Sequence, residues 1–107
     1  MDASDKATKA LSGMMKEAGD VFKGYMNFTK AIKEYGPLDS KMQEMILIAC
    51  SIMSQCDMCV SLHIQHGAAA GLTKEEIMQA AMLAISMGGS PKMMYMHYVF
   101  AELEDLF

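Results

Sequence analysis

Apolar residues recur at helical intervals along this chain. Near the N-terminus, Val21, Tyr25, Phe28 and Ile32 follow one another at steps of four, three and four residues, which places them on one helix face. No stretch alternates apolar and polar residues convincingly, and neither Asn-Gly nor Asp-Gly, the usual hairpin dipeptides, occurs. The pattern therefore predicts an all-α fold, with one compact helical domain of about six helices over residues 1–107.

Capping and turn residues divide this pattern into helices. Thr73 and Glu76 have the spacing of a capping box, in which each side chain bonds the other residue's backbone N–H. Pro91 suits the first turn of a last helix that Ser90 would cap. The expected helix starts are, in chain order, Ser4, Asp20, Asp39 or Ser40, Cys56, Thr73 and Ser90. The expected ends of the first five helices are Gly19, Tyr35-Gly36-Pro37, Met53, Gly71 and Gly88-Gly89.

The candidate chemistry lies between Cys56 and His63. On a helix, the steps of three residues from Cys56 to Cys59 and of four from Cys59 to His63 place all three side chains on one face. Two thiols at this spacing can close a disulfide, because one helical turn brings their Cα atoms within the roughly 7 Å that the bond requires. An imidazole one turn further along can accept or return a proton. The spacing predicts a thiol redox centre with its own base.

Glu44 is expected to face His63. If the third and fourth helices form a central antiparallel pair that turns near Met53-Ser54, these two residues lie about ten positions before and after the turn, and so opposite each other. A carboxylate in that place fixes the tautomer of the imidazole and makes it a better base. Glu44, His63 and Cys59 could then form a proton relay, with Cys56 completing the dithiol. The alternative is that Glu44 is a solvated acid on an exposed helix face.

A metal site is the main competing chemistry for this segment. Cys56, Cys59, His63 and His66 follow the pattern C-x2-C-x3-H-x2-H. On one helix these residues span ~15 Å, which is too far for four bonds of ~2 Å to a single zinc ion. Covalent haem would need a histidine directly after the second cysteine, where this chain has Val60. We therefore expect no metal and no cofactor, and His66 is expected to border the site as a bystander.

Composition limits the classes of partner. Hydrophobic residues make up 52% of this short chain, and an apolar excess of this size favours a homo-oligomer. The net charge is −4 and no basic cluster is present, so nucleic acid and anionic membranes are unexpected partners. The most apolar run, Met45–Met53, is too short to cross a membrane. The 14 methionines show helical spacing and are interpreted as flexible core filler.

The beginning of the chain and its cysteine count favour a cytoplasmic protein. The first residues lack a basic region followed by an apolar core, so no secretory signal is expected. Three cysteines, an odd number, are atypical of a secreted disulfide scaffold. Cys50 has no partner in a motif and is expected to be a small buried hydrophobe. His97 is expected to be a polar surface or interface residue rather than a catalyst.

Taken together, Glu44 and the Cys56, Cys59 and His63 motif twelve residues further on resemble the E…CxxCxxxH signature of the alkylhydroperoxidase D-like proteins. These proteins belong to the carboxymuconolactone decarboxylase superfamily. The resemblance covers about residues 37–100 and extends to flanking segments, namely Leu38-Asp39, Ala68–Ile77 and Gly88-Gly89. One position departs from the pattern of some members, which have a second histidine where this chain has Met58.

The resemblance implies an all-helical fold, usually trimeric or hexameric, and thiol-dependent reduction of hydroperoxides or of a partner's disulfide. It also implies an external dithiol donor and catalytic roles for Glu44, Cys56, Cys59 and His63. Two alternatives belong to other functional classes. The chain could be a non-catalytic oligomeric redox sensor or binding module, whose disulfide alters a partner surface. Lactone decarboxylation is suggested only by the superfamily's name, and that reaction has no use for a dithiol.

Overall fold

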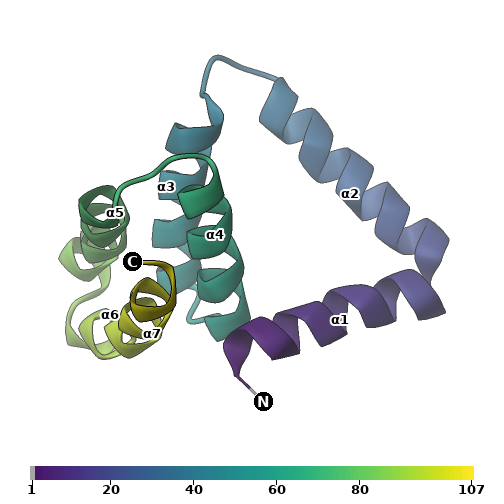
Figure 1. The fold of residues 1–107 in the computed structure, drawn as a ribbon. Helices are drawn as coiled ribbons and strands as arrows, with labels where there is room; N and C mark the ends of the chain where they lie inside the picture. The colour runs from purple at the N-terminus through teal and green to yellow at the C-terminus, as the bar shows by residue number, and fades with distance from the viewer. Residues whose placement is uncertain (1) are drawn as a thin grey trace. The chain divides into compact units, whose positions relative to one another are not determined.

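The computed structural model describes residues 2–107, and within this range every regular element is an α-helix (Figure 1). This confirms the predicted all-α fold. The contacts divide the chain into two compact units, residues 2–38 and residues 39–107. That residues 1–107 form one domain stays a prediction. Within the described residues, no helix is both long and apolar enough to cross a membrane.

The first unit consists of two helices, α1 (Ala3–Glu17) and α2 (Gly19–Glu34), which contact each other and diverge from their junction in the view of Figure 1. The predicted caps of both helices were wrong. The carboxylate of Asp2, not the hydroxyl of Ser4, accepts a hydrogen bond from the Asp5 backbone N–H at 2.8 Å. The second helix begins directly after the first, so Asp20 lies inside its first turn instead of capping it. There its negative charge still suits the positive end of the helix dipole.

The unit of residues 2–38 leaves much apolar surface uncovered in the single chain. Of its described residues, only Ala7 is buried. The predicted apolar face of α2 is present but exposed, with Val21, Tyr25, Phe28 and Ile32 each between 58% and 67% accessible. This face is as apolar as one that packs in a protein core, yet it is exposed in the single chain. Exposed apolar faces of this kind favour association with another chain.

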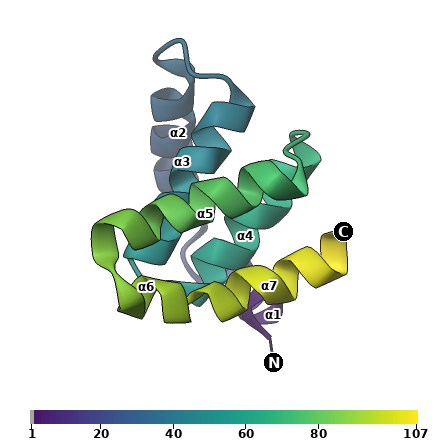
Figure 2. The same ribbon diagram turned by 90° about the vertical axis from the view of Figure 1, so that its left-hand side faces the viewer.

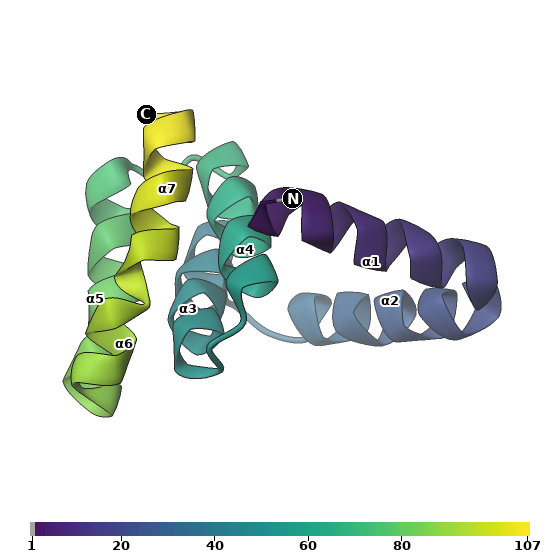
Figure 3. The ribbon, with the colours of Figure 1, turned by 90° about the horizontal axis from the view of Figure 1, so that it is seen from below.

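The second unit is built around two helices, α3 (Ser40–Met53) and α4 (Asp57–Ala69), joined by a three-residue turn. Such a short turn is typical of antiparallel helix pairs, and α3 and α4 lie side by side in this way, as predicted (Figures 1 and 3). Helix α5 (Lys74–Gly88) packs mainly against α3, and α7 (Met96–Leu106) packs mainly against α4. Between α5 and α7 lies the short helix α6 (Ser90–Met94), and Figure 2 shows the three helices in succession.

Local sequence signals account for most helix starts in this unit. Asp39 caps α3 by accepting from the Met42 backbone N–H at 2.9 Å, which selects it over Ser40. Thr73 and Glu76 form the predicted capping box, with reciprocal bonds of 3.1 and 2.9 Å. Gly89, not Ser90, is the cap residue of α6. Its backbone takes a φ of 74°, which glycine adopts without steric cost.

The last predicted helix is divided in two. Tyr95 separates α6 from α7, although the sequence shows one continuous apolar period from Met93 to Phe107. Met96 and Leu103 of that period are buried, whereas Phe100 and Phe107 are 48% and 57% exposed. The core of the unit is made by aliphatic side chains from four helices, of which the largest fully buried are Ile48, Ile52, Val60, Ile64, Ile77 and Val99.

Candidate active site

The turn between α3 and α4 places the first cysteine at a helix start. Gln55 has a φ of 50°, a left-handed conformation that few non-glycine residues adopt. Its side-chain oxygen accepts a hydrogen bond of 2.8 Å from Lys92 Nζ of α6. The next residue, Cys56, is the N-cap of α4, and its Sγ accepts from the Cys59 backbone N–H at 3.2 Å. The first sulfur therefore occupies the place that an oxygen fills in most helix caps.

Cys56 and Cys59 are joined by a disulfide, with their Cα atoms 5.2 Å apart. This confirms the predicted pairing, in which Cys50 takes no part. The expectation that Cys50 is buried was wrong, because its thiol is free and exposed. On α3 the buried positions are Glu44, Ile48, Ser51 and Ile52. Cys50 follows Ile48 by two residues, or about 200° around the helix, and so points away from the core.

Glu44 and His63 meet across the helix pair. Oε2 of Glu44 lies 2.8 Å from Nδ1 of His63. The glutamate side chain is only 9% exposed and that of the histidine 19%. The predicted contact is confirmed, and the alternative of a solvated Glu44 was wrong. Next to this contact, Ile48, one turn beyond Glu44 on α3, and Ile64, the residue directly after His63 on α4, are both fully buried in the core of the unit.

The contact determines which imidazole nitrogen can act as a base. A carboxylate only accepts hydrogen bonds, so Nδ1 of His63 donates to Glu44 and carries the proton of the neutral ring. The other nitrogen, Nε2, then keeps its lone pair. Cys59 lies four residues earlier on the same face of α4. The geometry thus supplies a disulfide whose reduction gives a dithiol, a base one helical turn from one sulfur, and an acid that orients this base.

His66 belongs to the same group of side chains, although the sequence favoured a bystander role. Its Nδ1 lies 4.0 Å from Oε1 of Glu44, and its ring meets that of His63 edge to face with centroids 5.9 Å apart. One ligand atom from each of Glu44, His63 and His66 falls within 4.8 Å of the others. The spacing of three residues between the histidines, which puts both on one helix face, was the available signal.

Tyr95, at the junction of α6 and α7, interacts electrostatically with Asp57 in the first turn of α4. Burial raises the pKa of its phenol above the ordinary value of 10.0, and the negative charge of Asp57 adds to this effect, as does Tyr98. The phenol is therefore neutral at physiological pH and can donate a hydrogen bond but not supply a phenolate. Asp57 directly follows Cys56 in the sequence, so the residue that acts on Tyr95 is the chain neighbour of the first cysteine of the motif.

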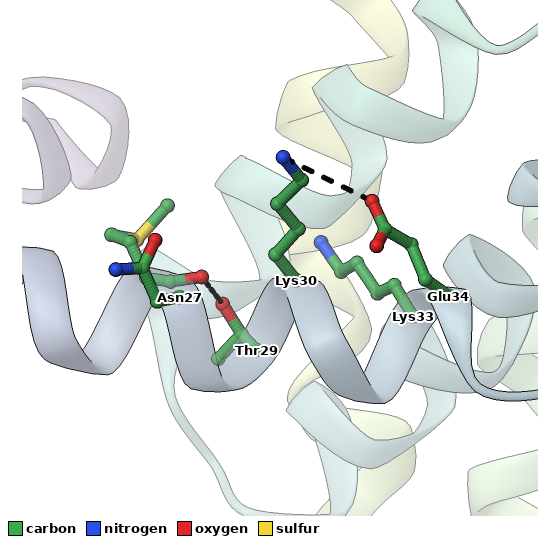
Figure 4. A pocket seen from close by; sticks show the side chains of 6 residues that line it. Asn27, Thr29, Lys30, Lys33 and Glu34 are labelled. Atoms are coloured by element: carbon green, nitrogen blue, oxygen red, sulfur yellow. Dashed lines mark hydrogen bonds and ion pairs between the residues drawn. The ribbon is translucent and has the colours of Figure 1, made fainter.

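The remaining candidates lie outside this group. His97 is exposed, as predicted, and its ring lies tilted against that of Tyr98, with the ring centroids 3.8 Å apart. One pocket, of about 430 Å³, lies on α2 and is lined by residues of that helix alone (Figure 4). Its Lys30–Glu34 ion pair is 4.0 Å long and highly exposed, so it contributes little to stability and arranges no acid–base chemistry.

Comparison with known proteins agrees with this fold and site. Residues 19–102 match the model of the carboxymuconolactone decarboxylase family. The chain belongs to this family, as the resemblance in sequence had indicated. It also resembles the apo crystal structure of a carboxymuconolactone decarboxylase family protein from Legionella pneumophila, with a TM-score of 0.87 and 28% identity. That similarity covers 97% of this chain and 93% of the other.

Two curated relatives align over nearly the whole chain. A protein of Cupriavidus necator, described as uncharacterized, is 30% identical over 97 residues, which are 91% of this chain and 83% of the relative. A protein of Paracoccus denitrificans, described as uncharacterized protein 4 in the cox locus, is 24% identical over 101 residues. The latter alignment covers 94% of this chain and 91% of the relative. These relatives support the family and assign no reaction.

Proposed function

We propose that this protein is a CxxC thiol–disulfide oxidoreductase that reduces hydroperoxides or a partner's disulfide. The observation that carries the proposal is the 2.8 Å contact between Glu44 and His63, on the helix pair that also holds the Cys56–Cys59 disulfide. A buried carboxylate that orients an imidazole is typical of general-base sites. A purely structural disulfide has no use for such a base.

The reaction begins with the reduced dithiol. Nε2 of His63 accepts the proton of the Cys59 thiol, and the thiolate attacks one oxygen of the hydroperoxide. An S–O bond forms, the O–O bond breaks, and the leaving alcohol takes the proton back from the imidazolium. Cys59 is then a sulfenic acid. The Cys56 thiol attacks this sulfur, a disulfide forms and water leaves.

The cycle closes by thiol–disulfide exchange. An external dithiol attacks the Cys56–Cys59 disulfide, passes through a mixed disulfide and leaves oxidised, while both cysteines regain their protons. One hydroperoxide and one dithiol thus give one alcohol, one water and one external disulfide. With a partner's disulfide as substrate, the reduced Cys56 and Cys59 attack that disulfide by the same exchange. They leave as the Cys56–Cys59 disulfide, and the partner's cysteines become reduced.

Two arguments concern which sulfur attacks first. Cys56 caps α4, and a helix N-terminus favours an anion by ~0.3–1 kcal/mol at an exposed site. Cys59 is one turn from His63, and general-base assistance is typically worth ~10²–10⁴ in rate, or about 3–5 kcal/mol. The base has the larger effect, so the proposal assigns attack to Cys59 and resolution to Cys56.

Turnover tests this function against the non-catalytic alternative. The reduced protein is given a hydroperoxide and excess dithiothreitol, and peroxide consumption is followed over many equivalents. Sustained consumption supports the proposal, with Cys50→Ser as active as the parent and the double variant Cys56→Ser, Cys59→Ser inactive. A protein that consumes one equivalent and stops is a redox sensor. A protein whose consumption survives loss of both motif cysteines would contradict the site assignment.

A further inference from the structure

The face of α4 that carries His63 presents a second histidine to the same buried carboxylate. Glu44 uses Oε2 to contact His63 at 2.8 Å, and its other oxygen, Oε1, lies 4.0 Å from Nδ1 of His66. The relay described above needs only the first of these contacts. The position of His66 is thus not explained by the thiol chemistry.

We propose that Glu44, His63 and His66 form a binding site for a divalent transition-metal ion such as zinc. Two imidazoles and one carboxylate are a common ligand set for such ions, and a fourth position would remain for water. Ligand atoms around a tetrahedral ion at about 2.1 Å lie about 3.4 Å from one another. The three ligand atoms here already fall within 4.8 Å, so small side-chain rotations suffice to reach that spacing.

Burial and exposure are divided among the three ligands in a way that suits metal capture. The side chains of Glu44 and His63 are 9% and 19% exposed and hold each other in place. That of His66 is 50% exposed, so it can turn toward an arriving ion and gives the site a route from solvent. This ligand set differs from the C-x2-C-x3-H-x2-H pattern: it keeps His63 and His66 but replaces the two cysteines with Glu44 of the neighbouring helix α3.

The ion would reverse the tautomer of His63. Without metal, Nδ1 carries the proton and donates to Glu44, which leaves the lone pair of Nε2 free. An ion bound through Nδ1 takes the lone pair of that nitrogen, and the proton of the neutral ring must then sit on Nε2. A protonated Nε2 cannot accept the proton of a thiol. Metal binding is therefore incompatible with the base role of His63, a consequence that rests on the proposed function.

Metal binding is tested on the oxidised protein, because a dithiol would itself bind zinc. The Cys56–Cys59 disulfide removes both thiols as ligands, and a Cys50→Ser background removes the third. Calorimetric titration with zinc chloride should show one ion per chain. His66→Ala should weaken binding by at least about tenfold, since loss of even a hydrogen-bonding partner of a ligand costs about 10–100-fold. His97→Ala, a histidine outside the group, is the matched control and should bind as the parent does.

Nitrogen NMR of the histidine rings gives a second readout that does not depend on enzyme activity. His63 should show a protonated Nδ1 without zinc and a protonated Nε2 with one equivalent of zinc. The proposal is overturned if the oxidised Cys50→Ser protein binds no zinc, or if His66→Ala binds as tightly as the parent. It is also overturned if zinc leaves the tautomer of His63 unchanged. These results test metal binding alone. Peroxide turnover by the metal-free protein tests the proposed function independently.

Discussion

Oε2 of Glu44 and Nδ1 of His63 lie 2.8 Å apart, although 19 residues separate them in the chain. The contact joins α3 to α4 at a depth where the carboxylate is almost fully covered. A buried carboxylate needs a partner that donates to it, and the imidazole provides one. In return, the histidine is held in one tautomer. This mutual dependence links the packing of the helix pair to the proposed chemistry.

The first prediction concerns this contact. Glu44→Gln keeps the shape of the side chain but removes its charge and allows an amide N–H to face Nδ1, which favours the wrong tautomer. Formation of the sulfenic acid at Cys59 should slow by about 10²-fold, toward the lower end of what a general base contributes. The rate is measured by stopped-flow mixing with hydroperoxide in a Cys50→Ser background.

Glu102→Gln provides the matched control for that experiment. The Glu102 carboxylate accepts a hydrogen bond from Gln65 at 3.3 Å and so bonds an amide, not an imidazole. Its replacement should leave the rate within about twofold of the parent, because it removes no proton acceptor from the relay. Equal rates for Glu44→Gln and the parent would show that no relay operates.

The second prediction concerns the order of the two sulfurs. Cys56→Ser retains the nucleophile and its base, so peroxide should convert it to one sulfenic acid per chain, detectable by dimedone adduction and mass spectrometry. Cys59→Ser lacks the thiol next to His63 and should react at least about 10²-fold more slowly. If the two variants react equally fast, or Cys56 is the faster, the helix N-terminus outweighs the base and the assignment reverses.

The third prediction concerns the capping box of α5. The hydrogen bond from the Thr73 backbone N–H lowers the pKa of Glu76 below its ordinary value of 4.5, with a smaller contribution from the charge of Lys41. A lowered folded-state pKa means that the carboxylate stabilises the fold above pH 4.5 and that this stabilisation is lost as pH falls through the folded-state value. Glu76→Gln keeps an acceptor without the charge. Its deficit in stability relative to the parent should therefore be larger at pH 7 than at pH 3.

Urea unfolding at both pH values measures this deficit. Glu75→Gln, a neighbouring change in the same first turn, is the control for general charge effects. Thr73→Ala removes the other half of the box and should lower the free energy of unfolding by about 1 kcal/mol. A deficit for Glu76→Gln that is the same at both pH values would show that the carboxylate is not the acceptor in solution.

The fourth prediction is that the protein is a homo-oligomer, with a hexamer favoured over a trimer. The apolar face of α2 is exposed in the single chain, and an exposed apolar face of this kind favours association between copies. Sedimentation should show an assembly at micromolar concentration. Phe28→Glu, a charge placed within that face, should shift the distribution toward smaller species, whereas Lys23→Glu, a charge change elsewhere on α2, should not. Sedimentation of the parent protein as a monomer would contradict the prediction.

The sequence by itself determined what lies within one helix. The apolar period predicted helices, and the Thr73 and Glu76 spacing predicted a capping box, because both depend on neighbours one turn apart. The spacing of Cys56, Cys59 and His63 likewise predicted a disulfide beside a base. Each of these features follows from helix geometry without reference to the rest of the chain.

The tertiary structure decided which face of each helix meets another. The apolar period of the last segment did not say that Met96 would be buried and Phe100 exposed. Nor did an isolated Cys50 reveal that it lies on the outer side of α3. Oε1 of Glu44 lies 4.0 Å from Nδ1 of His66, a distance that depends on how α3 and α4 pack together. Local spacing fixes positions around one axis, whereas the distance between two helices depends on the side chains packed between them.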